Sequence, residues 1–129
     1  MNRKKLLVAD DNEFIVRSLA MKLEACGYEV VVALDGATVV SLARQERPDL
    51  LLLDINFPPD VAHGGGIAWD GFLIINWLRR MDEVKDIPII IMTQSDPELY
   101  RERAAAANAI GLFQKPLDLT ALLNLIAEA

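Results

Sequence analysis

Five short apolar segments recur along the chain, and a longer stretch with apolar residues at helical spacing follows each of them. The segments are continuously apolar and rich in Leu, Ile and Val, as strands are when both faces of a parallel sheet are covered. They lie at residues 5–9, 29–33, 49–53, 87–92 and 111–114. The pattern therefore predicts a (βα) unit repeated five times.

The first helical stretch shows most clearly how these segments begin and end. Asn12 is a typical N-cap residue and Gly27 a typical stop signal. Between them, Ile15, Leu19 and Leu23 are spaced to share one face, which we expect to be buried. By the same signals, further helices are expected at residues 36–47, at 71–81, from Asp96 onward and at 118–128.

The alternation of strands and helices predicts the architecture. Right-handed crossovers between parallel strands place helices on both faces of the sheet. With 129 residues, of which 53% are hydrophobic, the chain is long enough for one such domain. We expect a doubly wound, five-stranded parallel α/β sandwich of flavodoxin-like type that spans residues 1–129. The one irregular region is 55–70, which is rich in Gly and Pro.

Charge and composition narrow the function. A net charge of −6 disfavours nucleic-acid binding by this segment, because phosphate contacts need clustered Lys and Arg. Every apolar run is far shorter than the roughly 20 residues that a membrane-spanning helix requires. The first residues also lack the longer apolar core of a signal peptide. We therefore expect no membrane association and a cytoplasmic location.

Acidic residues stand where two of the predicted strands end. Asp10 and Asp11 follow the first strand, and Asp54 follows the third. In open α/β sheets, ligands bind at the carboxyl edge of the strands. Carboxylates that meet there repel one another and need a divalent cation to stay ionised together, for which Mg²⁺ is the best candidate. These residues therefore predict a Mg²⁺ site.

Polar residues close four of the predicted strands, in the segments LLVADDN, RPDLLLLDI, PIIIMT and LFQKP. They place Asp10, Asp11, Asp54, Thr93 and Lys115 at strand ends. In this combination and order they resemble the receiver domain of two-component response regulators. The resemblance covers essentially the whole chain.

The resemblance implies a role for each of these residues. Asp54 would be the phosphoacceptor, a nucleophile that takes a phosphoryl group from a phosphohistidine. The implied Mg²⁺ ligands are Asp10, Asp11, Asp54 and the backbone carbonyl of Asn56. Thr93 and Lys115 would each contact a phosphoryl oxygen. In this family the bond between the Lys and the following Pro, here Lys115 and Pro116, is typically cis.

Three features depart from the usual pattern of the family. The position after the Thr is usually small, whereas here it is Gln94, whose longer amide is expected to crowd the route of attacking water and to lengthen the life of the phosphoryl group. Three residues before the Lys, where the family usually has Tyr or Phe, this chain has Leu112, and Phe113 would point to the opposite face. The aromatic half of the usual switch is therefore expected to be absent or rebuilt. An apparent insertion also follows Pro58, at about residues 61–69. A tolerated surface insertion and a partner-recognition element beside the site are both open interpretations.

The resemblance implies a signalling phosphoacceptor rather than a turnover enzyme, with self-phosphorylation and autodephosphorylation as its only chemistry. The expected donor is a sensor histidine kinase or a histidine phosphotransfer protein. The expected target is a downstream partner protein or a missing output domain. Whether the chain acts alone or is a fragment of a larger regulator stays open. An exposed face of the fourth and fifth helices could support a homodimer.

Other functions stay open beside this one. A phosphorylation-independent interaction module with the receiver fold is one, and Leu112 keeps it open. A Mg²⁺-dependent aspartyl-phosphate phosphatase is another, but such enzymes usually have a second acid two residues after the nucleophile, where this chain has Asn56. A flavodoxin-like cofactor binder is disfavoured because the acids after the first strand would repel a flavin phosphate.

Overall fold

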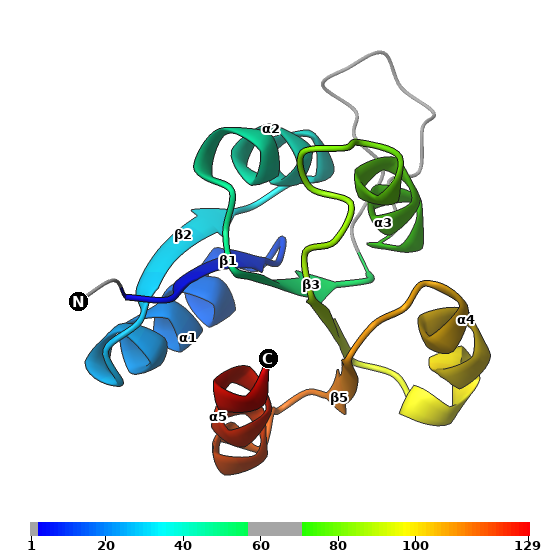
Figure 1. Cartoon of the computed structure of the whole chain (residues 1–129). Coiled ribbons are helices and arrows are strands. Elements are labelled where there is room, and N and C mark those ends of the chain that lie inside the picture. Colours follow the sequence, from blue (N-terminus) through cyan, green and yellow to red (C-terminus); the bar gives the residue numbers. More distant parts are fainter. Residues whose placement is uncertain (1–2, 57–70) are drawn as a thin grey trace.

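A five-stranded parallel β-sheet forms the middle layer of the molecule (Figure 1). The computed structural model describes residues 3–56 and 71–129. The strands are β1 Lys5–Ala9, β2 Glu29–Ala33, β3 Leu50–Asp54, β4 Ile89–Thr93 and β5 Gly111–Gln114. They pair in the order β2-β1-β3-β4-β5, and every pair is parallel. The predicted doubly wound sheet is therefore confirmed.

Helices cover both faces of this sheet (Figure 1). They are α1 Glu13–Ala25, α2 Gly36–Glu46, α3 Gly71–Arg79, the 3₁₀ turn η2 Pro97–Tyr100, α4 Arg101–Ala106 and α5 Leu119–Glu128. Buried side chains of α1 and α5 belong to one apolar cluster, and those of α2, α3 and α4 belong to another. The sheet therefore separates two halves of the core.

Alternate residues of the inner strands supply these two halves. In β3, Leu51 and Leu53 pack with the cluster of α2, α3 and α4, whereas Leu50 and Leu52 pack with that of α1 and α5. All four side chains are fully buried. Because both faces of the strand are covered, every position before the terminal Asp54 is apolar. This burial explains why the strand is a continuous apolar run in the sequence.

Asn and Asp side chains begin three of the helices. The cap bonds run from Ile15 N to Asn12 Oδ1 at 3.1 Å, from Thr38 N to Asp35 Oδ1 at 2.8 Å and from Ala121 N to Asp118 Oδ1 at 3.2 Å. Each bond satisfies a backbone N–H that has no partner within the helix. The predicted cap at Asn12 is therefore confirmed, and it fixes where the chain turns after β1.

The buried face of α1 differs from the predicted one. The spacing predicted Ile15, Leu19 and Leu23, whereas the buried residues are Val16, Ala20 and Leu23. Ile15 and Leu19 are only half-buried, because they line a pocket that opens between α1 and the segment after β5. The helix therefore shares its apolar residues between the core and this pocket.

The predicted fourth helix is only partly continuous. Asp96 begins it as expected, by accepting a hydrogen bond from Glu98 N at 3.0 Å, but the first turn is a 3₁₀ turn and α4 itself spans Arg101–Ala106. Ala104 is the only buried residue of α4, and Asn108 follows in a left-handed conformation with φ of 58°. With so little apolar surface to bury, nothing stabilises a longer helix.

Two sequence expectations lie beyond what the structure describes or tests. The apparent insertion at residues 61–69 lies outside the described residues. A homodimer through the fourth and fifth helices stays a prediction. Among the residues that the structure does describe, no helix has both the length and the apolar character needed to cross a membrane.

Arg79, at the end of α3, ties three segments together at the edge of the sheet opposite the strand ends. Its guanidinium donates to Lys85 O at 2.8 Å and Ile87 O at 2.7 Å, just before β4. It also donates to Ala107 O and Asn108 O at 3.3 Å, just after α4. Burial lowers the pKa of this guanidinium, although Asp86 opposes that shift. One side chain thus holds the end of α4 against α3 and β4, and these contacts are called the Arg79 clamp below.

We predict that Arg79→Met lowers the free energy of unfolding by about 2–3 kcal/mol, because carbonyls around the guanidinium lose charged donors. Urea denaturation followed by circular dichroism measures this change. The matched control is Arg80→Met, an exposed neighbour, which should stay within about 0.5 kcal/mol of the parent. Equal losses in both variants would show that the clamp contributes nothing specific.

Candidate functional site

Four neighbouring strands bring polar side chains to one edge of the sheet. Asp10 directly follows β1, Asp54 is the last residue of β3, Thr93 is the last residue of β4, and Lys115 directly follows β5. These strands are adjacent in the order β1-β3-β4-β5, so their carboxyl ends lie side by side. The sequence analysis predicted that Asp54 directly follows its strand, whereas in the structure Asp54 is the last residue of that strand. The predicted gathering of these residues at the carboxyl edge is confirmed.

Three carboxylates form the acidic part of the site. Asp10, Asp11 and Asp54 each offer an oxygen, and these oxygens lie within 4.8 Å of one another. Asp10 and Asp54 are only 1% and 2% exposed, whereas Asp11 is exposed. Carboxylate oxygens are the ligands that hard divalent cations prefer. Geometry and donor chemistry therefore fit a metal ion.

Backbone N–H groups orient the two buried acids. Asp10 Oδ1 accepts from Asn12 N at 3.0 Å, and Asp54 Oδ1 accepts from Asn56 N at 2.9 Å. Both bonds reach two residues ahead along the chain, as in an Asx turn. With one oxygen of each carboxylate held in this way, the other oxygen is directed towards Lys115.

Lys115 is the counter-ion of these acids. Its Nζ lies 2.5 Å from Asp10 Oδ2 and 3.0 Å from Asp54 Oδ2, and its side chain is only 10% exposed. Its backbone N–H donates to Thr93 O at 2.8 Å, which continues the β4–β5 pairing one residue past β5. The peptide bond between Lys115 and Pro116 is cis, as the resemblance implied.

The ionisation of the site reflects burial and charge together. Burial raises the pKa of Asp54, although the Asn56 N–H and the Lys115 ammonium oppose the shift. The pKa of Asp11 is raised by desolvation and by its neighbour Asp10. For Lys115, burial acts to lower the pKa, but Asp10 and Asp54 outweigh burial and raise it. A cation added beside these acids would favour their ionised forms.

Thr93 lies across the site from Lys115 in the hydrogen-bond network. Its side chain is fully buried, and its hydroxyl accepts from Ser95 N at 3.0 Å. The same hydroxyl lies 3.4 Å from Asn56 Oδ1 in a long hydrogen bond. Thr93 and Asn56 thus lie together beside Asp54. The hydroxyl is free to donate elsewhere by rotation about one bond.

Leu112 takes the place where the resemblance led us to look for an aromatic ring. It is half-buried and packs against the cluster of α2, α3 and α4, as Tyr100 does, whereas Phe113 packs against the other cluster. The prediction that Phe113 points to the opposite face is confirmed. The aromatic contact on this side is instead between Tyr100 and Phe72, whose ring centroids are 6.0 Å apart.

Gly71 is a residue of the site that sequence reasoning missed. Its N–H donates to Ile55 O at 3.0 Å, and a Cβ added to it would lie 2.5 Å from Ile55 Cα. Only a glycine lets α3 begin this close to the chain that leaves β3. Its position at the start of a predicted helix was the one available signal. Through Ile55, Gly71 supports the backbone on which Asp54 and Asn56 stand.

Three comparisons place these features among known proteins. The family model described as the response regulator receiver domain matches residues 6–127. Protein PilH of Pseudomonas aeruginosa is 33% identical over 122 residues, which cover 95% of this chain and 93% of PilH. The response regulator PleD of Caulobacter vibrioides is 33% identical over 114 residues, but this chain spans only 23% of PleD.

Solved structures show the same fold. The chemotaxis response regulator CheY4 of Vibrio cholerae superposes with a TM-score of 0.82 at 26% sequence identity, covering 98% of both chains. The signal receiver domain of a modulated diguanylate cyclase from Desulfovibrio desulfuricans gives a TM-score of 0.79 at 28% identity. The similarity therefore extends over the whole sheet and both helical layers.

We predict that Gly71→Ala destabilises the protein by about 1–3 kcal/mol, because the new methyl group displaces the backbone at Ile55. Urea denaturation measures the loss, and the NMR shift of the Asn56 amide reports the displacement. The matched control is Gly111→Ala, whose Cβ would meet the flexible end of Leu125 instead of backbone. An unmoved Asn56 amide in Gly71→Ala would contradict this role.

Proposed function

The chain belongs to the response regulator receiver domain family, and we propose that it takes a phosphoryl group onto Asp54 in a two-component phosphorelay. The observation that carries the proposal is the environment of Asp54. This carboxylate is buried at the end of β3, paired with Lys115, and within 4.8 Å of two further acids. A nucleophile held in this way meets the requirements of phosphoryl transfer, which depends on positioning and charge stabilisation.

The transfer uses the residues as they stand. A carboxylate oxygen of Asp54 forms a bond to phosphorus while the bond from phosphorus to the donor imidazole nitrogen breaks. No proton has to leave Asp54, because its ionised form is the nucleophile. Lys115 is close enough to place its ammonium against one phosphoryl oxygen, and the Thr93 hydroxyl donates to another by leaving its bond with Asn56.

Asp10, Asp11, Asp54 and the backbone carbonyl of Asn56 would hold Mg²⁺, which when bound neutralises charge on the phosphoryl oxygens. Lys115 pairs with carboxylate oxygens of Asp10 and Asp54, and a metal cation would bind to carboxylate oxygens of the same two residues. Its ammonium therefore keeps the acids together before a cation binds. With a cation held by these acids, Lys115 would be free to contact the phosphoryl group.

The donor is a sensor histidine kinase or a histidine phosphotransfer protein, and the target is a partner protein or an output domain. Thr93 connects the site to the target surface. When the Thr93 side chain moves towards the phosphoryl group, its oxygen also moves away from Ser95 N, whose hydrogen bond to that oxygen holds the start of the segment leading to η2. This change shifts the population towards a state that a partner recognises on residues 97–129.

A second candidate function is a phosphorylation-independent interaction module. The observation that favours it is Leu112, because an aliphatic residue there removes the ring that usually responds to Thr93. An aspartyl-phosphate phosphatase finds less support, since Asn56, two residues after Asp54, uses its amide oxygen on Thr93 and offers no carboxylate.

We predict that incubation with Mg²⁺ and acetyl phosphate adds one phosphoryl group to the parent protein, as measured by intact mass spectrometry. Asp54→Asn should gain none, because the nucleophilic carboxylate is gone. Asp82→Asn is the control, because Asp82 is an exposed acid that follows α3 and is not one of the residues at the carboxyl ends of the strands. This variant should gain one phosphoryl group like the parent. If the parent gains no mass and also fails to bind beryllium fluoride, the interaction module becomes the better account.

We also predict that Lys115→Met raises the affinity for Mg²⁺ by about tenfold, because it removes a positive charge that competes for Asp10 and Asp54. The same variant should take a phosphoryl group from acetyl phosphate onto Asp54 more slowly than the parent. Calorimetric titration with Mg²⁺ measures the first effect. Lys85→Met, an exposed lysine just before β4, is the control, and an equal or weaker Mg²⁺ affinity in Lys115→Met would refute the competition.

A further inference from the structure

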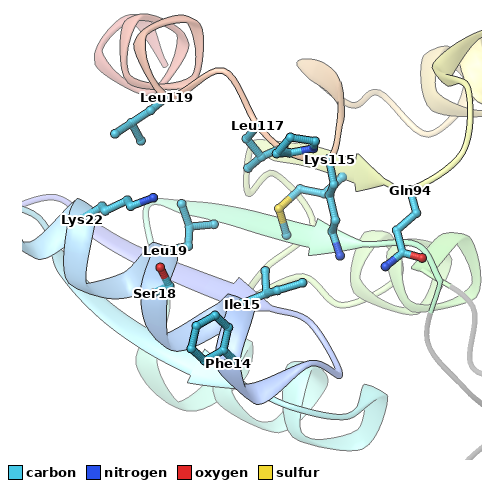
Figure 2. Close-up of a pocket in the computed structure, with 11 residues that line it drawn as sticks. Phe14, Ile15, Ser18, Leu19, Lys22, Gln94, Lys115, Leu117 and Leu119 are labelled. Carbon is cyan, nitrogen blue, oxygen red and sulfur yellow. The ribbon is translucent and has the colours of Figure 1, made fainter.

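Gln94 extends beyond the end of β4 at the rim of the site. The residue is exposed, and no hydrogen bond joins its side chain to the rest of the described chain. Figure 2 shows Gln94 and Lys115 at the same end of a pocket that lies between α1 and the segment after β5. The carboxamide thus has two donor hydrogens available beside the phosphorylation site.

The register of the sheet fixes where this side chain stands. Thr93 pairs with Gln114, and Lys115 N donates to Thr93 O, so Gln94 and Lys115 are the next pair along β4 and β5. Alternation along a strand puts Gln94 on the same face as Met92, and both residues line the pocket. Gln94 and Lys115 are therefore cross-strand neighbours on one face.

The same register relates Gln94 to Asp54. Asp54 pairs with Met92, so Gln94 lies two residues further out, about 6–7 Å beyond the level of Asp54. A phosphoryl group on Asp54 extends in that direction, because the fully buried Leu52 and Leu53 fill the space behind Asp54. Gln94 thus stands beside the place that the phosphoryl group would occupy.

We propose that Gln94 sets the lifetime of the phosphoryl group on Asp54, by donating a hydrogen bond to a phosphoryl oxygen and narrowing the opening through which water arrives. Gln94 follows β4, the strand beside β3, so it approaches from the side of the phosphoryl group and not from the position opposite Asp54. The attacking water needs that opposite position for in-line displacement. Gln94 therefore shields the group and does not orient the water.

This inference rests on the proposed function, and the step that it controls is hydrolysis. The water oxygen forms a bond to phosphorus as the bond from phosphorus to the Asp54 oxygen breaks. Inorganic phosphate leaves, Asp54 returns as a carboxylate, and the water proton is released. Thr93 and Lys115 are needed to form the adduct, whereas Gln94 acts on how long it lasts.

The test compares decay of the adduct in the parent, Gln94→Ala and Gln94→Glu, with Gln45→Ala as the control. Gln45 is an exposed glutamine of α2. Each protein is phosphorylated with acetyl phosphate and Mg²⁺, freed of donor, and followed by intact mass spectrometry. We expect the half-life to fall about two- to tenfold in Gln94→Ala, the range that one hydrogen bond supplies. It should also fall in Gln94→Glu, which cannot donate, and should be unchanged in Gln45→Ala.

An equal or longer half-life in Gln94→Ala would overturn the proposal. Failure of the parent to gain mass would refute the proposed function instead, so the two failures are distinguishable. Beryllium fluoride affinity is the second measurement, because it is taken at equilibrium without decay. It should be weaker in Gln94→Ala than in the parent, and an unchanged affinity would also count against the hydrogen bond.

Discussion

The pairing of Lys115 with Asp10 and Asp54 is the interaction on which the rest of the site depends. Two nearly buried carboxylates at the ends of adjacent strands repel one another, and the ammonium between them offsets that repulsion. Residue 115 reaches residues 10 and 54 because the sheet order sets β1, β3, β4 and β5 side by side. The ammonium and a metal ion would use the same acids, so the site can be charge-balanced with either one.

The sequence was most informative where neighbouring strands act together. Apolar runs predicted all five strands to within two residues, because burial on both faces of the inner strands favours apolar residues along most of their length. The polar residues at strand ends then predicted the site, since parallel strands share one carboxyl edge. The cis bond at Pro116 and the opposite placement of Phe113 followed from the resemblance together with strand alternation.

Prediction was weaker where distant parts of the chain decide the outcome. Ile15 and Leu19 have helical spacing, but they line a pocket whose other wall includes Leu117, about a hundred residues away. Periodicity along one helix contains no information about that wall. The role of Gly71 was missed for the same reason, because its close contact with Ile55 appears only when α3 packs beside the end of β3. The 3₁₀ turn before α4 reflects how little of that helix is buried, which a capping signal at Asp96 does not report.

The Arg79 clamp has a mechanical consequence for the helix that follows β4. One end of α4 is bonded through Ala107 and Asn108 to α3 and to the entry of β4, while the other end continues from the segment that Thr93 holds through Ser95. A helix that is held at one end and displaced at the other rotates about the held end instead of translating. A displacement of the segment after Thr93 would therefore turn η2 and the first turn of α4 about the Arg79 clamp, and with them Leu99, one of the most exposed apolar side chains.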